Sequence, residues 1–180
     1  SPAVPRRHRV IVSVVDGDTG KRVGGALVRA GRLADRANRR GNAELRLRRL
    51  APLVVSVRAR GYGDLRLRLP FQRKRRVVVR VYHENLQWPM YGATPARTQA
   101  HLAIRVRPPF RVVWSRGMGS LIEFPAVVSD GVAYISNSHG TVRALSMRNG
   151  HVFWRRDIRH GKMAASPAVV GDDLVVHGMD

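Results

Sequence analysis

The sequence contains no cysteine, which excludes disulfide bridges, thiolate metal sites and cysteine nucleophiles. Aromatic residues make up only 6% of the chain, so stacking platforms for nucleic-acid bases are scarce. No apolar run approaches the roughly 18 residues that a membrane-spanning helix needs. These absences favour a globular chain that is stabilised by its hydrophobic core rather than by covalent cross-links.

Acidic residues are also few: the sequence has 12 Asp and Glu against 33 Lys and Arg, which gives a net charge of +21. The excess lies in the first part of the chain: residues 1–82 hold 22 basic and 5 acidic side chains, whereas residues 83–180 hold 11 and 7. Such a charge attracts nucleic acid, anionic envelope polymers or acidic lipid headgroups. The alternative is an arginine-rich composition that simply fills solvent-exposed positions.

The beginning of the sequence shows no targeting signal. Residues 1–9 lack the apolar segment of a signal peptide, and the first residue is Ser rather than Met. We therefore expect that the natural start was removed or lies upstream.

Residues 9–82 follow the two-residue period of β-strands, with apolar side chains on one face and arginines on the other. The alternating runs are Leu45 and Leu47 with Arg46 and Arg48, Leu65, Leu67 and Leu69 with Arg66 and Arg68, and Val77, Val79 and Val81 with Arg80. Turn-forming residues separate these runs. The pattern predicts a small antiparallel β-sandwich of about six or seven strands over residues 1–82.

Three motifs in this region resemble the carboxypeptidase-regulatory-like (transthyretin-like) β-sandwich. They are VVDGDTGKRVGGALV at residues 14–28, the Asn-x-x-Gly turn that begins at Asn38, and VRARGY at residues 57–62. The family's usual acidic or threonine residues before that turn are replaced by Arg36 and Ala37. The resemblance implies an accessory module for folding, spacing or adhesion, with no catalytic residue to carry over.

The basic strands and one dense charge run are candidates for polyanion binding. The candidate residues are Arg73, Lys74, Arg75 and Arg76 in an expected loop, and Arg46, Arg48, Arg66 and Arg68 on strands. Alternatively, they form a solvated loop and solvated strand faces. Residues 1–82 contain three aromatic side chains, Tyr62, Phe71 and Tyr82, and we interpret Tyr62 as a corner residue. Nucleic acid is therefore only weakly supported as the partner.

A repeat marks the second half of the chain. The segment FPAVVSD at residues 124–130 returns as SPAVVGD, with Pro167 lying 42 residues after Pro125. Trp154 lies 40 residues after Trp114. This period is typical of four-stranded propeller blades, which bury their faces against neighbouring blades.

Two further motifs resemble quinoprotein-like (PQQ-like) β-propellers. WPMYGATPART at residues 88–98 is similar to the segment that precedes the first blade, and GTVRALSMRNGHVFW at residues 140–154 is similar to the family repeat. The resemblance implies a linker and entry segment over residues 83–107, then one full blade and part of a second over residues 108–180. It gives structural roles to Trp114, Pro125, Gly140, Leu145, Gly150, Trp154 and Pro167.

No catalytic constellation emerges from the residues. Ser138, His139 and Asp157 could serve as nucleophile, base and orienting acid, but their spacing does not require it. Glu123 and Asp130 are better interpreted as polar residues at a blade edge. The seven histidines show no metal-ligand spacing, so no metal, cofactor or catalytic residue is predicted.

The predicted fold class is thus all-β: a small antiparallel β-sandwich followed by an incomplete β-propeller. We expect a non-catalytic binding or scaffold protein of the bacterial cell envelope or exterior, where both resembled families are common. It would recognise a protein or polymer through propeller loops, assisted by the basic sandwich. Two alternatives stay open: a fragment of a PQQ-dependent dehydrogenase, and a module that binds nucleic acid or acidic polysaccharide. The oligomeric state is left open.

Overall fold

The computed structural model describes residues 8–49, 51–69, 76–102, 104–158 and 162–179. The fold is all-β, which confirms the predicted class: the described residues form fifteen strands and one short 3₁₀ helix. The chain divides into two compact units, unit 1 (Ser1–Glu84) and unit 2 (Asn85–Asp180). Within the described ranges, no helix has the length and apolar character that crossing a membrane requires.

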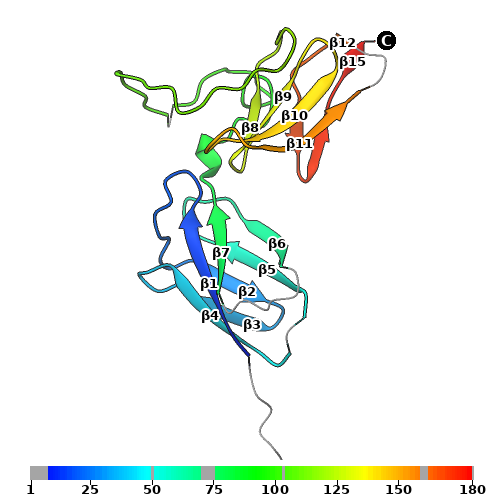
Figure 1. Cartoon of the computed structure of the whole chain (residues 1–180). Coiled ribbons are helices and arrows are strands. Elements are labelled where there is room, and N and C mark those ends of the chain that lie inside the picture. The colour runs from blue at the N-terminus through cyan, green and yellow to red at the C-terminus, as the bar shows by residue number, and fades with distance from the viewer. Residues whose placement is uncertain (1–7, 50, 70–75, 103, 159–161, 180) are drawn as a thin grey trace, which may run out of the picture. The chain divides into compact units, whose positions relative to one another are not determined.

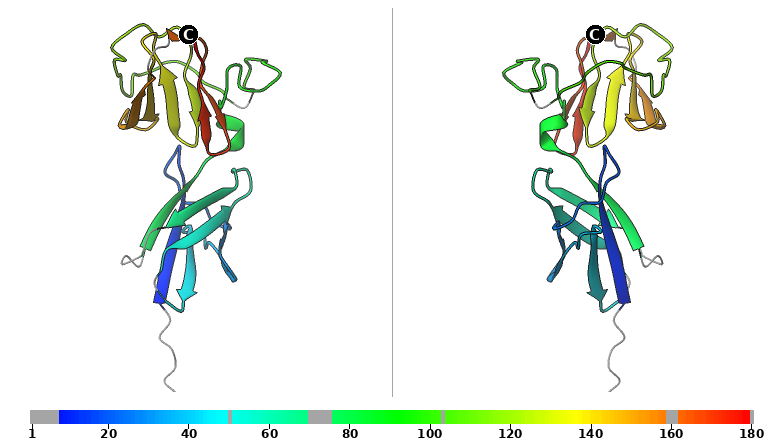
Figure 2. Two further views of the ribbon diagram at one scale, coloured as in Figure 1. Left: turned by 90° about the vertical axis from the view of Figure 1, so that its right-hand side faces the viewer. Right: turned by 90° about the vertical axis from the view of Figure 1, so that its left-hand side faces the viewer.

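Unit 1 consists of two layers of strands (Figures 1 and 2). One sheet has the order β4-β1-β7 and the other the order β3-β2-β5-β6. The strands are β1 (His8–Asp16), β2 (Leu27–Ala30), β3 (Leu33–Arg36), β4 (Asn42–Leu47), β5 (Leu53–Arg58), β6 (Leu65–Leu69) and β7 (Arg76–Val81). Strand β7 runs parallel to β1, whereas the other pairs of unit 1 are antiparallel. This parallel pair departs from the purely antiparallel sandwich expected.

The hydrophobic core of unit 1 draws on both sheets, which gives the unit its sandwich-like character. Its buried members come from six of the strands and include Val12 and Val14 of β1, Val55 and Val57 of β5, and Leu45 of β4. The predicted alternation is confirmed, because Leu45 and Leu47 are buried while Arg46 and Arg48 are exposed. Packing of the apolar faces leaves the arginines on outward positions of both sheets.

A buried carboxylate, that of Asp16, lies at one end of unit 1. Asp16 ends β1 and is only 4% exposed. Its Oδ1 atom accepts hydrogen bonds from the backbone N–H groups of Asp18 and Thr19, both at 2.9 Å. Its Oδ2 atom accepts a 3.0 Å hydrogen bond from the hydroxyl of Tyr62. The imidazole of His83 stacks on the Tyr62 ring with centroids 4.0 Å apart, so the network joins β1, the turn before β6 and the residues that follow β7.

Unit 2 contains one four-stranded antiparallel sheet with strands in sequence order, β11-β10-β9-β8. These strands are β8 (Val127–Ser129), β9 (Val132–Ser136), β10 (Thr141–Ser146) and β11 (Val152–Asp157). Two smaller pairs follow, β12 (Lys162–Met163) with β15 (Gly178–Met179), and β13 (Ala168–Val170) with β14 (Asp173–Val175). The helix η1 (Glu84–Leu86) spans the boundary between the units. The described strands of unit 2 do not close into a ring.

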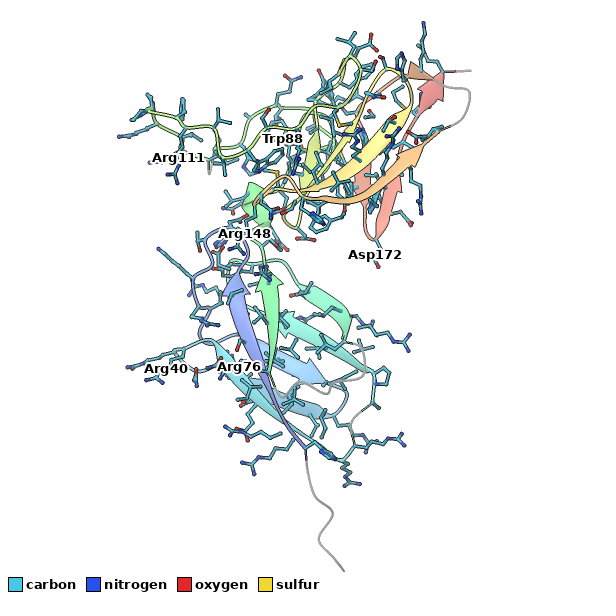
Figure 3. The ribbon with its side chains drawn as sticks, viewed as in Figure 1. Arg40, Arg76, Trp88, Arg111, Arg148 and Asp172 are labelled. Carbon is cyan, nitrogen blue, oxygen red and sulfur yellow. The ribbon has the colours of Figure 1, made fainter. Side chains whose placement is uncertain are left out.

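The sequence repeat corresponds to a structural repeat in unit 2. The first copy forms β8, which pairs with β9 across a short turn, and the second copy forms β13, which pairs with β14 in the same way. Residues 89–126 carry no strand in the described part of this segment. Arg111 lies on a loop of this segment that projects away from the four-stranded sheet (Figure 3).

Candidate functional site

The outward side of sheet β3-β2-β5-β6 carries five arginines, which we call the arginine face: Arg29, Arg36, Arg58, Arg66 and Arg68. They share a face because strand side chains alternate and the apolar partners point into the core. In the register, Arg29 lies opposite Ser56, and Ser56 lies opposite Arg66. All five arginines are exposed. The sheet therefore arranges them in rows across neighbouring strands.

A hollow of about 570 Å³ lies on this face, a volume typical of small-ligand sites. It is lined by Leu27, Arg29, Gly31, Val54, Ser56, Arg58, Asp64, Leu65 and Arg66. Ser56 stands between the long side chains of Arg29 and Arg66, and Gly31 has no side chain. These small residues explain why the surface is hollowed there.

Few charges on the arginine face are neutralised. Arg58 donates from Nε to Asp64 Oδ2 at 2.7 Å, but the two side chains are 70% and 63% exposed. Exposed ion pairs of this kind contribute about 0–1 kcal/mol and exchange readily with solvent or ligand. Among the described residues, Arg29, Arg66 and Arg68 have no acidic partner within ion-pair distance. The face is consequently strongly positive.

The opposite face, on the outward side of β4-β1-β7, has a different charge arrangement. Glu44 binds two arginines there, Arg9 at 2.6 Å and Arg46 at 3.0 Å. Hydrogen bonds from Arg46, and next those from Arg9, hold the pKa of the Glu44 carboxyl below its usual value. An Nη atom of Arg76 lies 3.5 Å from the Ser13 hydroxyl. Several basic groups of this face are therefore already engaged within the protein.

The structure separates the strand arginines predicted as one candidate set. Arg46 and the following Arg48 belong to β4 and its end, whereas Arg66 and Arg68 belong to β6 in the other sheet. The two pairs consequently lie on opposite outward faces.

The predicted basic loop is only partly described. Arg73, Lys74 and Arg75 lie outside the described residues. Arg76 is the first residue of β7 and pairs in register with Ile11. It is thus a strand residue, which corrects its assignment to a loop.

Sequence reasoning missed Arg29, Arg36 and Arg58 as members of the site. Each stands on an outward position of its strand, but none belongs to a repeated Leu-Arg pattern. The signal available in the sequence was that Arg29 and Arg58 alternate with the valines Val28, Val55 and Val57, which are apolar and therefore expected to point inward. Grouping them further required knowledge of which strands pair.

The residues given structural roles in the repeat differ in burial. Gly140, Leu145, Gly150 and Pro167 are buried and Pro125 is exposed, while Trp114 and Trp154 are half-buried. The Trp114 indole donates from Nε1 to the Met147 carbonyl at 2.8 Å. It also covers Gly150, where an added Cβ would lie 2.7 Å from the ring. Trp114 thus packs onto the β10–β11 turn.

Ser138 and Asp157, two members of the hypothetical triad, have other partners. Ser138 Oγ lies 2.8 Å from Ser120 Oγ. The Asp157 carboxylate accepts hydrogen bonds from Arg155 and, at 2.7 Å, from the Thr141 hydroxyl. Hydrogen bonds from Arg155, followed by that from Thr141, lower the pKa of Asp157. Within the described ranges, no group of three or more His, Asp or Glu side chains is placed to hold a metal ion.

A second hollow, in unit 2, brings the two repeat copies together. Its lining includes Asp130 of the first copy, Asp172 of the second and the following Asp173, together with Tyr134 and Trp154. The last two rings are tilted, with centroids 6.0 Å apart. Burial raises the pKa of Asp130. Asp172 is visible at the tip of the β13–β14 hairpin (Figure 3).

No protein-family model matches the chain, and no curated protein matches it. The two resemblances inferred from sequence motifs stay predictions.

Proposed function

We propose that this chain is a non-catalytic binding protein of the bacterial cell envelope or exterior, and that unit 1 engages an anionic polymer. The observation that carries the proposal is the distribution of charge in unit 1. Apolar side chains of both sheets fill its core, whereas exposed arginines cover its outward strand positions. The excess of basic residues is thereby presented as two extended surfaces.

Arginine suits this role because its planar guanidinium binds carboxylate, sulfate and phosphate groups through paired hydrogen bonds. Of the 33 basic residues, 30 are Arg. A polymer that contacts several of them releases its condensed counterions, which favours binding entropically at low salt. The same field steers the polymer toward the surface before contact.

We propose further that unit 2 is built from quinoprotein-like propeller repeats and presents loops to a protein or polymer. Two features support this: the repeated hairpins and the four-stranded antiparallel sheet with strands in sequence order. Large apolar side chains of unit 2 are exposed, among them Leu102, Val106, Phe110, Val112, Val113 and Phe153. Apolar surface of this extent is typical of a module that packs against neighbours.

Calorimetric titration of the full chain with dextran sulfate, and in parallel with unmodified dextran, tests the proposal. The two polymers share one sugar backbone and differ in charge. We expect binding of dextran sulfate and no heat signal with dextran. Equal binding of both polymers, or of neither, would contradict the proposal.

A further inference from the structure

We infer that the arginine face is a binding site for an anionic polysaccharide and that the opposite face of unit 1 is not. This inference rests on the proposed function and deepens it, because it names both the surface and the ligand class. It follows from three features: the spacing of the arginines, the charge of the opposite face and the chemistry of the hollow.

The spacing on the arginine face provides several attachment points for successive anionic groups. Arg29 and Arg66 flank Ser56 across three neighbouring strands, which places their backbones roughly 9–10 Å apart. Arg68 follows Arg66 on the same side of β6, about 7 Å further along the strand. One polymer can therefore contact all three guanidinium groups while its backbone crosses the hollow.

Among the described strand residues, the opposite face offers fewer cations without an acidic partner. There Glu44 holds both Arg9 and Arg46 through hydrogen bonds. An incoming anion has to displace this carboxylate or bind beside its negative charge. On the arginine face the only described acid that pairs with an arginine is Asp64, which pairs with Arg58, and the other four arginines have no acidic partner among the described residues.

The lining of the hollow favours a sugar over a nucleic acid. Leu27, Val54 and Leu65 supply aliphatic surface that can pack against the C–H groups of a pyranose ring. Ser56 and the Asp64 carboxylate can hydrogen-bond sugar hydroxyl groups.

Nucleic acids need features that the lining lacks. Single strands are bound by stacking on aromatic side chains, and none occurs among the described residues that line the hollow. Duplex DNA is read by a helix or a β-ribbon inserted into a groove, and a recessed sheet face offers neither.

The test compares two triple variants of the full chain that lose the same charge. R29Q/R66Q/R68Q removes three arginines from the arginine face, and R46Q/R48Q/R80Q removes three from the other side. Dextran sulfate is titrated into each protein at one fixed salt concentration. We expect the first variant to bind at least about tenfold more weakly than the unmodified chain, because it loses three guanidinium groups that form charge-assisted hydrogen bonds with the polymer. The matched control should bind within about threefold, the effect of long-range charge alone.

The possible results distinguish a wrong choice of face from a wrong proposed function. Equal weakening of both variants would overturn the choice of face and leave the proposed function intact. Absence of binding by the unmodified chain would contradict the proposed function itself. Duplex DNA is titrated in parallel, and DNA binding as tight as that of dextran sulfate, with the same loss in R29Q/R66Q/R68Q, would overturn the polysaccharide assignment.

A second measurement uses the unmodified chain and so does not depend on the folding of a variant. A dicarbonyl reagent modifies exposed arginines, and mass spectrometry locates the adducts. Dextran sulfate should protect Arg29, Arg66 and Arg68 and leave Arg48 and Arg80 reactive. Uniform protection, or protection of the second group alone, would contradict the inference.

Discussion

At the scale of single residues, the buried carboxylate of Asp16 accepts the hydrogen bonds that connect one end of unit 1. Burial alone would raise its pKa, but hydrogen bonds from the Thr19 N–H, the Tyr62 hydroxyl and the Asp18 N–H together lower it. Those donors favour the charged form. The pKa of Tyr62 shifts in the opposite direction. Burial of the hydroxyl is the main cause of the rise, and its hydrogen bond to Asp16 is the second.

Replacing Asp16→Asn should destabilise unit 1 by about 1–3 kcal/mol at neutral pH, because buried donors lose their charged acceptor. In the unmodified chain this contribution is complete above the ordinary aspartate pKa of about 3.9 and disappears as pH falls through the lower folded value. Urea unfolding of both proteins at several pH values measures it. The difference between them should shrink in acid, and a difference independent of pH would contradict this role.

Asp64→Asn is the matched control for this substitution. Asp64 is exposed and paired only at the surface, so the change should alter the free energy of unfolding by less than about 1 kcal/mol.

Alanine substitutions at Gly41 and Gly20 distinguish the cost of backbone strain from the cost of a steric clash. Both have positive φ angles, +71° and +73°, so Ala costs about 1–2 kcal/mol at either position. Only at Gly41 would the new Cβ also meet backbone, 2.6 Å from the Val14 carbonyl oxygen, whereas nothing lies within 4 Å at Gly20. Thermal unfolding should show a clearly larger loss of stability for Gly41→Ala. Equal losses would mean that the loop moves to accommodate the side chain.

At the scale of elements, β4 illustrates the two-residue period that organises unit 1. Leu45→Ala should cost about 2–5 kcal/mol, because Leu45 is 1% exposed in the core and its truncation leaves a cavity. Arg46→Ala, at the neighbouring exposed position of β4, should cost no more than about 1 kcal/mol, because Arg46 makes only an exposed ion pair with Glu44. Chemical denaturation of the two variants measures both. Comparable losses would show that the faces of β4 are assigned wrongly.

The same period made much of unit 1 predictable. The alternating runs around Leu45, Leu67 and Val79 indicate which face of each strand is buried, because apolar and basic residues alternate with the two-residue period of a strand. Strand pairing was not predictable in this way. The parallel contact between β1 and β7 joins residues about 65 positions apart, and no local pattern encodes it.

The limits of the site prediction have the same physical origin. Arg46 and Arg66 look equivalent in sequence, since each alternates with leucines, yet their strands belong to different sheets. The packing of Trp114 on Gly150 likewise depends on a contact between distant segments. The two copies of the PAVV segment, by contrast, have equivalent local structure, because each copy contains its own strand and turn.

At the scale of the whole molecule, charge and apolar exposure are distributed differently in the two units. Residues 1–82 hold 22 of the 33 basic side chains, and apolar side chains from both sheets of unit 1 form its buried core. Unit 2 carries less charge and exposes large apolar residues such as Leu102 and Val112. This contrast is consistent with the proposal that unit 1 engages an anionic polymer and that unit 2 presents loops to a protein or polymer.

The central claim is that arginines of unit 1 bind an anionic polymer through several simultaneous ionic contacts. The measurement that tests it most directly is the association constant of the full chain for dextran sulfate across a series of salt concentrations. Several released counterions predict a linear fall of log K with log salt, with a slope of roughly −3 or steeper. Binding that does not change with salt, or no binding at the lowest salt concentration, would contradict the claim.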